Sequence, residues 1–155
     1  SWYDGISMLG TRERTISQAS FIKAIKFLLK KDRMFSWEDF FEEPIQKELL
    51  ILYFNTVASI FKNAWKNKGY ILCKTAGVSA MINILDSIIK DLKEKGITLS
   101  NEKGLSLNTT VLQKYLIKIE DFDFSSRKVG KLYLGDAGIR TLTEDLKTKI
   151  FQGIQ

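Results

Sequence analysis

An apolar stripe between residues 75 and 96 is the feature that most constrains the fold of this chain. Its side chains recur at intervals of three and four residues, the spacing of one face of an α-helix. The stripe consists of Val78, Met81, Ile82, Leu85, Ile88, Ile89 and Leu92. We expect Thr75 to cap the start of this helix. Lys93 and Lys95 suit its last turn, and Gly96 is a typical stop. The sequence therefore predicts a long amphipathic helix here.

The same spacing predicts four more helices. They are expected at about 17–31, from Pro44 to about 65, at 108–119 and at 137–151. Pro44 suits the first turn of its helix, where a missing N–H costs nothing. That helix is apolar around much of its circumference, which predicts a central position.

The connections between these helices are expected to be turns and loops, with an irregular segment from Glu120 to Gly135. Residues 36–41 could form one helical turn, and residues 97–105 a polar loop. Short extended pieces are predicted at 70–73 and 131–134. The predicted fold is all-α: a single-domain bundle of about five helices over 15–155, after an irregular segment at 1–14.

The composition is that of one globular domain. The chain has 155 residues, of which 45% are hydrophobic and 27% charged, so disorder is not expected. No apolar run approaches the roughly eighteen residues of a membrane span, and Ser1–Asp4 does not resemble a signal peptide. Because the chain does not begin with Met, we interpret it as a segment of a larger protein. The single cysteine, Cys73, is expected in the core, and a cytoplasmic location is the simplest expectation.

The chain contains no histidine. Ser-His-Asp and Cys-His catalysis and His-ligated zinc are therefore excluded. Acidic residues gather at 38–43 and 120–123, but they lack the alternating pattern of a calcium loop. We expect no cofactor, no bound metal and no active site in this segment.

Basic residues form the main candidate site. Lys23, Lys26 and Lys30 would share one face of the first helix, and Arg12, Arg14, Lys31 and Arg33 flank it. With a net charge of +6, such a ridge could neutralise phosphates of DNA. The alternative is an ordinary solvated helix face.

Three weaker candidates remain. Lys74 and Thr75 precede a long helix and could assist in holding an anion. The run from Gly135 to Arg140 echoes a Gly-x-x-Gly loop, but Asp136 is better interpreted as an N-cap. Trp37 could stack on a base, whereas Trp65 lies on an apolar stripe and is expected in the core.

Three stretches in order resemble the helical part of DGQHR-domain proteins, which include DndB-like proteins of DNA phosphorothioation systems. They are Ile16-Ser17-Gln18-Ala19-Ser20-Phe21-Ile22-Lys23-Ala24-Ile25, Tyr53-Phe54 with Phe61-Lys62-Asn63-Ala64-Trp65, and Ile71-Leu72-Cys73-Lys74-Thr75-Ala76-Gly77-Val78-Ser79-Ala80. The resemblance spans roughly residues 12 to 92. The motif that names the family is absent, because Asp4-Gly5 is followed by Ile6. The resemblance thus implies the C-terminal helical portion, with any chemistry in a preceding part.

Two functions are expected from these observations, and an enzyme that uses the clusters of Glu and Asp is the least favoured alternative. The first is a non-catalytic helical domain that supports DNA binding in a bacterial DNA-modification or defence system, through Arg12, Arg14, Lys23, Lys26, Lys30, Arg33, Lys74 and Thr75. The second is a protein-interaction or homo-oligomerisation module without nucleic-acid contact. It predicts an exposed apolar patch, for which Trp37, Phe40 and Phe41 are candidates.

Overall fold

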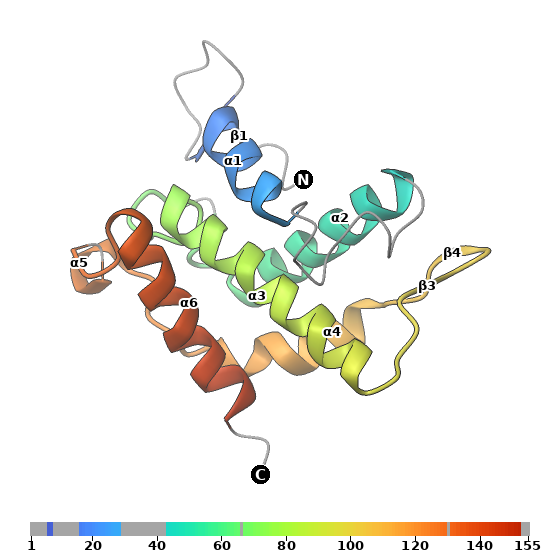
Figure 1. Ribbon diagram of the computed structural model, residues 1–155. Helices are drawn as coiled ribbons and strands as arrows, with labels where there is room; N and C mark the ends of the chain where they lie inside the picture. The colour runs from blue at the N-terminus through green and yellow to red at the C-terminus, as the bar shows by residue number, and fades with distance from the viewer. Residues whose placement is uncertain (1–5, 8–15, 29–42, 66, 130, 153–155) are drawn as a thin grey trace.

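The computed structural model describes residues 6–7, 16–28, 43–65, 67–129 and 131–152 of the chain. These residues are mainly helical, which confirms the predicted all-α class (Figure 1). The helices are α1 (Gln18–Leu28), α2 (Glu43–Ile60), α3 (Thr75–Glu94), α4 (Thr109–Leu116), α5 (Ser126–Val129) and α6 (Gly135–Phe151), and a 3₁₀ turn, η3 (Ile117–Ile119), extends α4.

Two pairs of very short strands accompany the helices. Strand β1 (Ile6–Ser7) pairs in parallel with β2 (Ile16–Ser17), which leads directly into α1. Strands β3 (Ser100–Asn101) and β4 (Gly104–Leu105) form an antiparallel hairpin that projects from the body of the molecule (Figure 1). The loop expected at 97–105 is therefore a hairpin.

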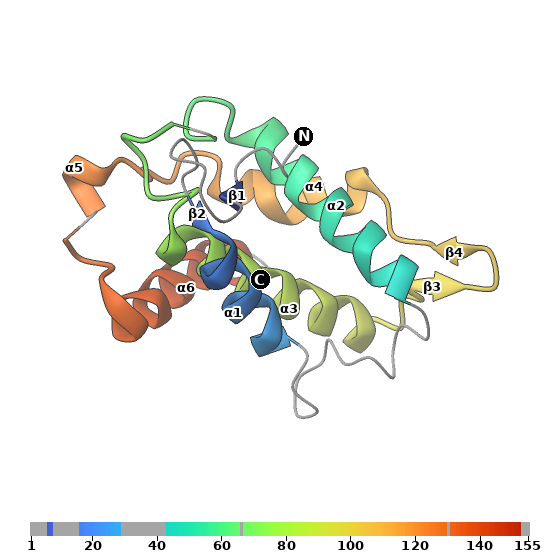
Figure 2. The same ribbon diagram turned by 90° about the horizontal axis from the view of Figure 1, so that it is seen from above.

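Helix α3 is the centre of the fold. Its predicted apolar stripe is buried throughout, and α1 and α6 pack against it. In Figure 2, α2 and α4 lie on one side of α3 and α6 lies on the other. The Tyr53 hydroxyl of α2 donates a hydrogen bond of 2.6 Å to the Met81 carbonyl of α3, and burial raises the pKa of this phenol well above its usual value.

The prediction that the Pro44 helix is central was wrong. Helix α2 does begin next to Pro44, and it buries Leu49, Tyr53 and Val57 completely. However, Asn55 and Ser59 are exposed. These two positions lie one turn apart, so α2 keeps one face in solvent and occupies the flank of the bundle.

The end of α3 follows the prediction, and its start does not. Gly96 adopts a positive φ of 73°. Its N–H donates to Lys93 O, and the Ile97 N–H donates to Leu92 O, both at 2.9 Å. These two bonds define a Schellman cap. At the other end Lys74 occupies the N-cap position, and its side chain makes no capping hydrogen bond to the helix, so Thr75 is the first helical residue and not the cap.

A close backbone approach fixes the start of α3. A Cβ atom on Gly77 would lie 2.2 Å from the carbonyl oxygen of Ile71 and 2.5 Å from that of Leu72. Only glycine therefore fits where the chain folds back onto the first turn of α3. In this segment Tyr70 makes a single antiparallel bridge to Ser125, and the expected extended piece at 70–73 is otherwise a turn.

The second expected extended piece, at 131–134, was also wrong. The described residues of this segment form turns, and a short helix, α5, precedes them. Tyr133 is buried, and its hydroxyl donates a 2.5 Å hydrogen bond to Asp145 of α6. Burial and this bond raise the pKa of Tyr133 to about 12. The hydrogen bond from Tyr133 to α6 thus holds this segment in place without strand pairing.

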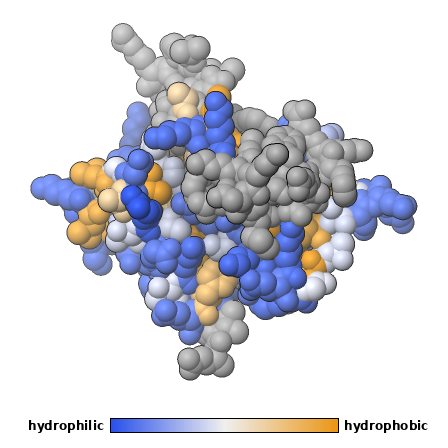
Figure 3. Space-filling view, in the orientation of Figure 1, coloured by the Kyte–Doolittle hydropathy of each residue, from blue (hydrophilic) through white to orange (hydrophobic). Residues whose placement is uncertain are grey.

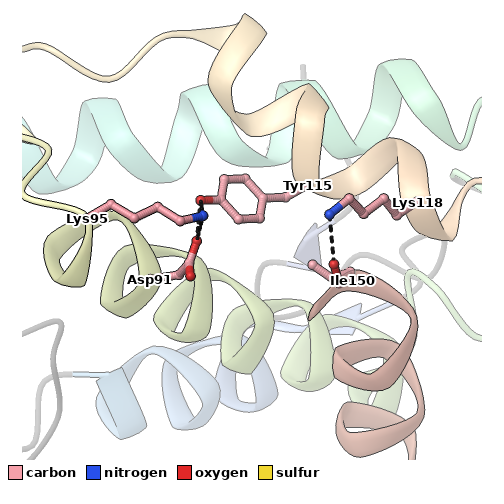
Figure 4. A network of polar contacts seen from close by, with 5 residues as sticks. All are labelled: Asp91, Lys95, Tyr115, Lys118 and Ile150. Atoms are coloured by element: carbon pink, nitrogen blue, oxygen red, sulfur yellow. Dashed lines mark hydrogen bonds and ion pairs between the residues drawn. The ribbon is translucent and has the colours of Figure 1, made fainter. Parts of the chain in front are cut away.

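Polar contacts join the C-terminal ends of α3, α4, η3 and α6 (Figure 4). Asp91 of α3 accepts hydrogen bonds from Tyr115 of α4 at 2.5 Å and from Lys95 at 2.6 Å. Lys118 of η3 donates to the Ile150 carbonyl of α6 at 3.0 Å. These contacts fasten α4 and η3 to α3 and α6.

The network shifts the acidity of its members. Burial by itself raises the pKa of Asp91, but the hydrogen bonds from Lys95 and Tyr115 outweigh it, so the pKa lies below its ordinary value. Burial, followed by the bond to Asp91, raises the pKa of Tyr115. The bond to Asp91 likewise raises the pKa of Lys95. Asp91 is therefore held as a carboxylate in the folded protein.

Candidate functional site

A groove of about 740 Å³ lies where α1, α3 and α6 meet. Both α1 and α6 pack against α3, so α3 forms the floor and the other two helices form the walls. Its volume is within the range of about 300–1,000 Å³ that is common for small-molecule sites. It is the candidate functional site.

The floor is a polar line along α3. Thr75, Ser79, Asn83 and Ser87 follow one another at intervals of four residues, which places them along one side of the helix. Asp86 lies beside them on the same helix. Hydroxyl and amide groups both donate and accept hydrogen bonds, so this floor suits a polar ligand.

A hydrogen bond connects α6, which forms one wall, to α3, which forms the floor. The Asn83 amide nitrogen donates a 3.2 Å hydrogen bond to the Thr143 hydroxyl, which itself donates to the Ile139 carbonyl at 2.8 Å. Thr143 is 4% exposed, so this junction is buried. The junction fixes the Asn83 side chain, whose Oδ1 atom makes no hydrogen bond to any other described residue.

Charged side chains line both walls. Helix α1 contributes the exposed residues Lys23 and Lys26. Helix α6 contributes Asp136, Arg140, Glu144 and Lys147. Because Lys147 donates to Glu144 at 3.2 Å, these last two charges largely offset each other.

The remaining cations are available to a ligand. Within the described part of the chain, no ion pair involves Lys23, Lys26 or Arg140. Asp86 and Asp136 carry the two other acidic groups of the lining. The walls can therefore attract an anionic ligand, and the groove can also accept hydrogen bonds from hydroxyl groups of that ligand.

The structure brings some of the predicted site residues together. Lys23, Lys26 and Thr75 all line the groove. Lys74 does not, because its ammonium group donates a 3.0 Å hydrogen bond to the Ser126 hydroxyl of α5. The other predicted residues, Arg12, Arg14, Lys30 and Arg33, lie outside the described residues.

The interpretation of the Gly135–Arg140 run needs a correction. The N-cap of α6 is Leu134, and Asp136 lies inside the first turn, so Asp136 is not the cap. Gly138 is required by packing, because a Cβ atom there would lie 2.2 Å from the carbonyl carbon of Tyr133. This run shapes the turn before α6, and it brings Asp136 and Arg140 to the groove.

The weaker candidates also have definite places. Cys73 is buried, as expected, at 5% exposure. Trp65 packs against the core with its ring 6.3 Å from that of Phe54. No cluster of three metal-ligating side chains occurs among the described residues. The acidic group at 38–42, with Trp37, Phe40 and Phe41, lies outside them.

Sequence reasoning missed most of the groove. Ser79, Asn83 and Ser87 had a usable signal, because their four-residue spacing from Thr75 defines a polar side of the predicted helix. Arg140 had only the weak signal of the Gly135–Arg140 run, and Thr143 had none, since its hydrogen bond to Asn83 joins residues 60 positions apart.

Comparisons with known proteins give no family for this chain. No model of a protein family matches it, and no curated protein and no solved structure shows significant similarity to it. Among the helices in the described residues, none combines the length and apolar character that crossing a membrane requires.

Proposed function

We propose that this chain is a non-catalytic helical domain that supports DNA binding by contacting phosphate groups. The observation that carries the proposal is the pair of exposed lysines on α1, Lys23 and Lys26, which line the same groove as Arg140 of α6. In line with the resemblance to DGQHR-domain proteins, the biological setting would be DNA modification or defence, and any catalytic step would belong to another part of the parent protein.

Electrostatics favours phosphate as the partner of these side chains. Lys23 and Lys26 are three residues apart on one helix, so both can reach neighbouring phosphates of one strand. Each phosphate that a cation neutralises releases close to one counterion from DNA, which favours binding at low salt. Asp86 and Asp136 oppose this attraction, but the three cations outnumber them. Backbone contacts of this kind position a protein on DNA without reading its sequence.

Charge reversal on α1 tests the proposal. The Lys23→Glu/Lys26→Glu double variant should bind a labelled DNA duplex at least tenfold more weakly than the unaltered chain, as measured by fluorescence anisotropy. The matched control is Lys47→Glu/Lys114→Glu, which changes the net charge equally at exposed positions on α2 and α4. Equal losses in the two variants would mean that only overall charge matters, and the proposal would then fail.

A second function, a protein-interaction or oligomerisation module, is favoured by a different observation. Leu132 and Leu134 are 67% and 69% exposed in the turn before α6. The space-filling view shows apolar surface gathered near this region, at the edge beside α5 (Figure 3). Exposed apolar groups of this kind mark interaction surfaces when they are contiguous.

Sedimentation across a concentration series tests this second function. An oligomer that dissociates in Leu132→Asp/Leu134→Asp but persists in the control Ile97→Asp, at another exposed apolar position, would support it. A chain that stays monomeric at all concentrations would exclude self-association through this turn.

A further inference from the structure

We infer that the groove between α1, α3 and α6 is a binding site for a sugar phosphate: a small ligand with one phosphate group and several hydroxyl groups. The groove would hold this ligand whether or not the basic face contacts DNA. Its volume of about 740 Å³ accommodates a molecule the size of a nucleoside monophosphate or a hexose phosphate.

The chemistry of the floor identifies the hydroxyl-bearing half of the ligand. Thr75 and Ser79 present hydroxyl groups along α3, the Ser87 hydroxyl can accept while it donates to the Asn83 carbonyl at 3.1 Å, and the described lining contains no aromatic side chain. Stacking on a base or an apolar ring is therefore not what these residues offer. Groups that both donate and accept hydrogen bonds match the hydroxyls of a sugar.

The junction with α6 makes part of this floor rigid. The bond from Asn83 to Thr143 orients the Asn83 amide before any ligand arrives. Its Oδ1 atom is then fixed as an acceptor on the side of α3 that also carries Ser79 and Ser87. Fixing a polar group in advance lowers the entropy lost on binding, so a small polar ligand can gain useful affinity here.

The charges identify the phosphate-bearing half. Lys23, Lys26 and Arg140 can surround a phosphate, and hydrogen bonds between ionised groups are the strong ones. Asp136, exposed on α6, also lines the groove, and its charge would repel a ligand with several phosphates. The same carboxylate can accept hydrogen bonds from sugar hydroxyls. Mixed charges of this kind favour one phosphate and a polyol over a triphosphate or a bare anion.

Isothermal titration calorimetry on the full chain tests the inference. The probes are ribose 5-phosphate, inorganic phosphate and ribose. Ribose 5-phosphate should bind at least tenfold more tightly than either part alone, which is the gain expected from adding a second set of hydrogen bonds of about 1.4 kcal/mol in total. Equal binding of ribose 5-phosphate and inorganic phosphate would overturn the inference, because it would reveal an unspecific anion site.

Two substitutions locate the binding. Ser79→Leu places a larger apolar side chain on the floor and should weaken ribose 5-phosphate binding at least tenfold. Thr110→Leu, at an exposed helical position on α4, should leave it unchanged. Binding that survives Ser79→Leu would place the ligand elsewhere and refute the site.

Two further measurements identify the class of ligand and distinguish this inference from the DNA proposal. Tighter binding of adenosine monophosphate than of glucose 6-phosphate would assign the site to nucleotides, and the reverse order to carbohydrate phosphates. Ser79→Leu keeps all three groove cations, so it should block the sugar phosphate and spare the duplex. Duplex binding without sugar-phosphate binding would sink this inference alone, and the opposite result would sink the DNA proposal alone.

Discussion

Replacing Gly77 by alanine should destabilise the chain, because the added methyl group would meet the backbone that precedes α3. The new Cβ atom would lie 2.2 Å from Ile71 O, 2.5 Å from Leu72 O and 2.6 Å from Leu72 Cα. All three are backbone atoms, so no side chain can rotate away. Ordinary contact begins at 3.4 Å, and α3 must therefore move from the preceding turn by more than an ångström.

The size of the effect follows from two opposing terms. Overpacking of this kind costs about 1–3 kcal/mol and occasionally more. Alanine recovers up to about 1 kcal/mol of helix propensity, although less in a first turn. Because the obstacle is rigid backbone on both sides, we expect a net loss of about 2–3 kcal/mol, or roughly 4–12 °C in Tm for a chain of this length.

Thermal unfolding followed by circular dichroism measures this loss. Gly69→Ala is the matched control, because the nearest atom to its Cβ would be the side-chain oxygen of Asn67 at 3.2 Å, which can give way. The control should change Tm little. A Gly77→Ala variant as stable as Gly69→Ala would show that the close approach at the start of α3 is wrong, and the position of the groove floor with it.

Three other substitutions probe the fold that holds the groove. Tyr115→Phe removes a hydrogen bond to the Asp91 carboxylate and should cost about 1 kcal/mol at neutral pH. Because the pKa of Asp91 is lowered on folding, this contribution to stability is present above the ordinary carboxyl pKa of about 3.9 and is lost as the pH falls below it. Urea unfolding at pH 7 and pH 3 should show that the difference in unfolding free energy between the unaltered chain and Tyr115→Phe shrinks at the lower pH. A constant difference would contradict the network. Asn108→Ala removes the only side-chain cap of α4 among the described residues and should cost about 1 kcal/mol in the same assay, whereas an unchanged midpoint would argue against that cap. Leu142→Ala empties a completely buried position of α6 and should cost about 2–5 kcal/mol; a loss below 1 kcal/mol would mean that α6 is not packed into the core.

Local sequence signals predicted the helices because each helix carries its own evidence. The stripe of α3 is buried along its whole length, and the lysine–glycine ending forms the expected Schellman cap at Gly96. Asn108 caps α4 through a 3.1 Å bond to the Val111 N–H, at the start that its sequence predicts. In these cases a few neighbouring residues determine both the periodicity and the boundary.

Features that depend on distant contacts were not predictable in this way. The sequence predicts a short strand at residues 131–134, but a strand needs a partner, and here Tyr133 bonds to Asp145 of α6 instead. Thr75 suits an N-cap, yet the close approach at Gly77 starts the helix with Lys74 as its cap. The tertiary packing decided both outcomes.

The candidate site also contains residues that local spacing predicts and residues that depend on distant contacts. The spacing of Lys23 and Lys26 predicts a shared face, and both do line the groove. The predicted contribution of Lys74 fails because its ammonium group bonds to Ser126. Arg140 enters the site because α6 packs on α3, and local residue spacing gives no signal for that contact.

A salt titration of duplex DNA binding tests the central proposal most directly. Three phosphate contacts, from Lys23, Lys26 and Arg140, should give a slope of about −2.7 in a plot of the logarithm of the binding constant against the logarithm of salt concentration. The Lys23→Glu/Lys26→Glu variant should flatten that slope by about 1.8. Absence of binding at low salt, or a slope that the variant leaves unchanged, would contradict the proposal that these side chains contact DNA phosphates.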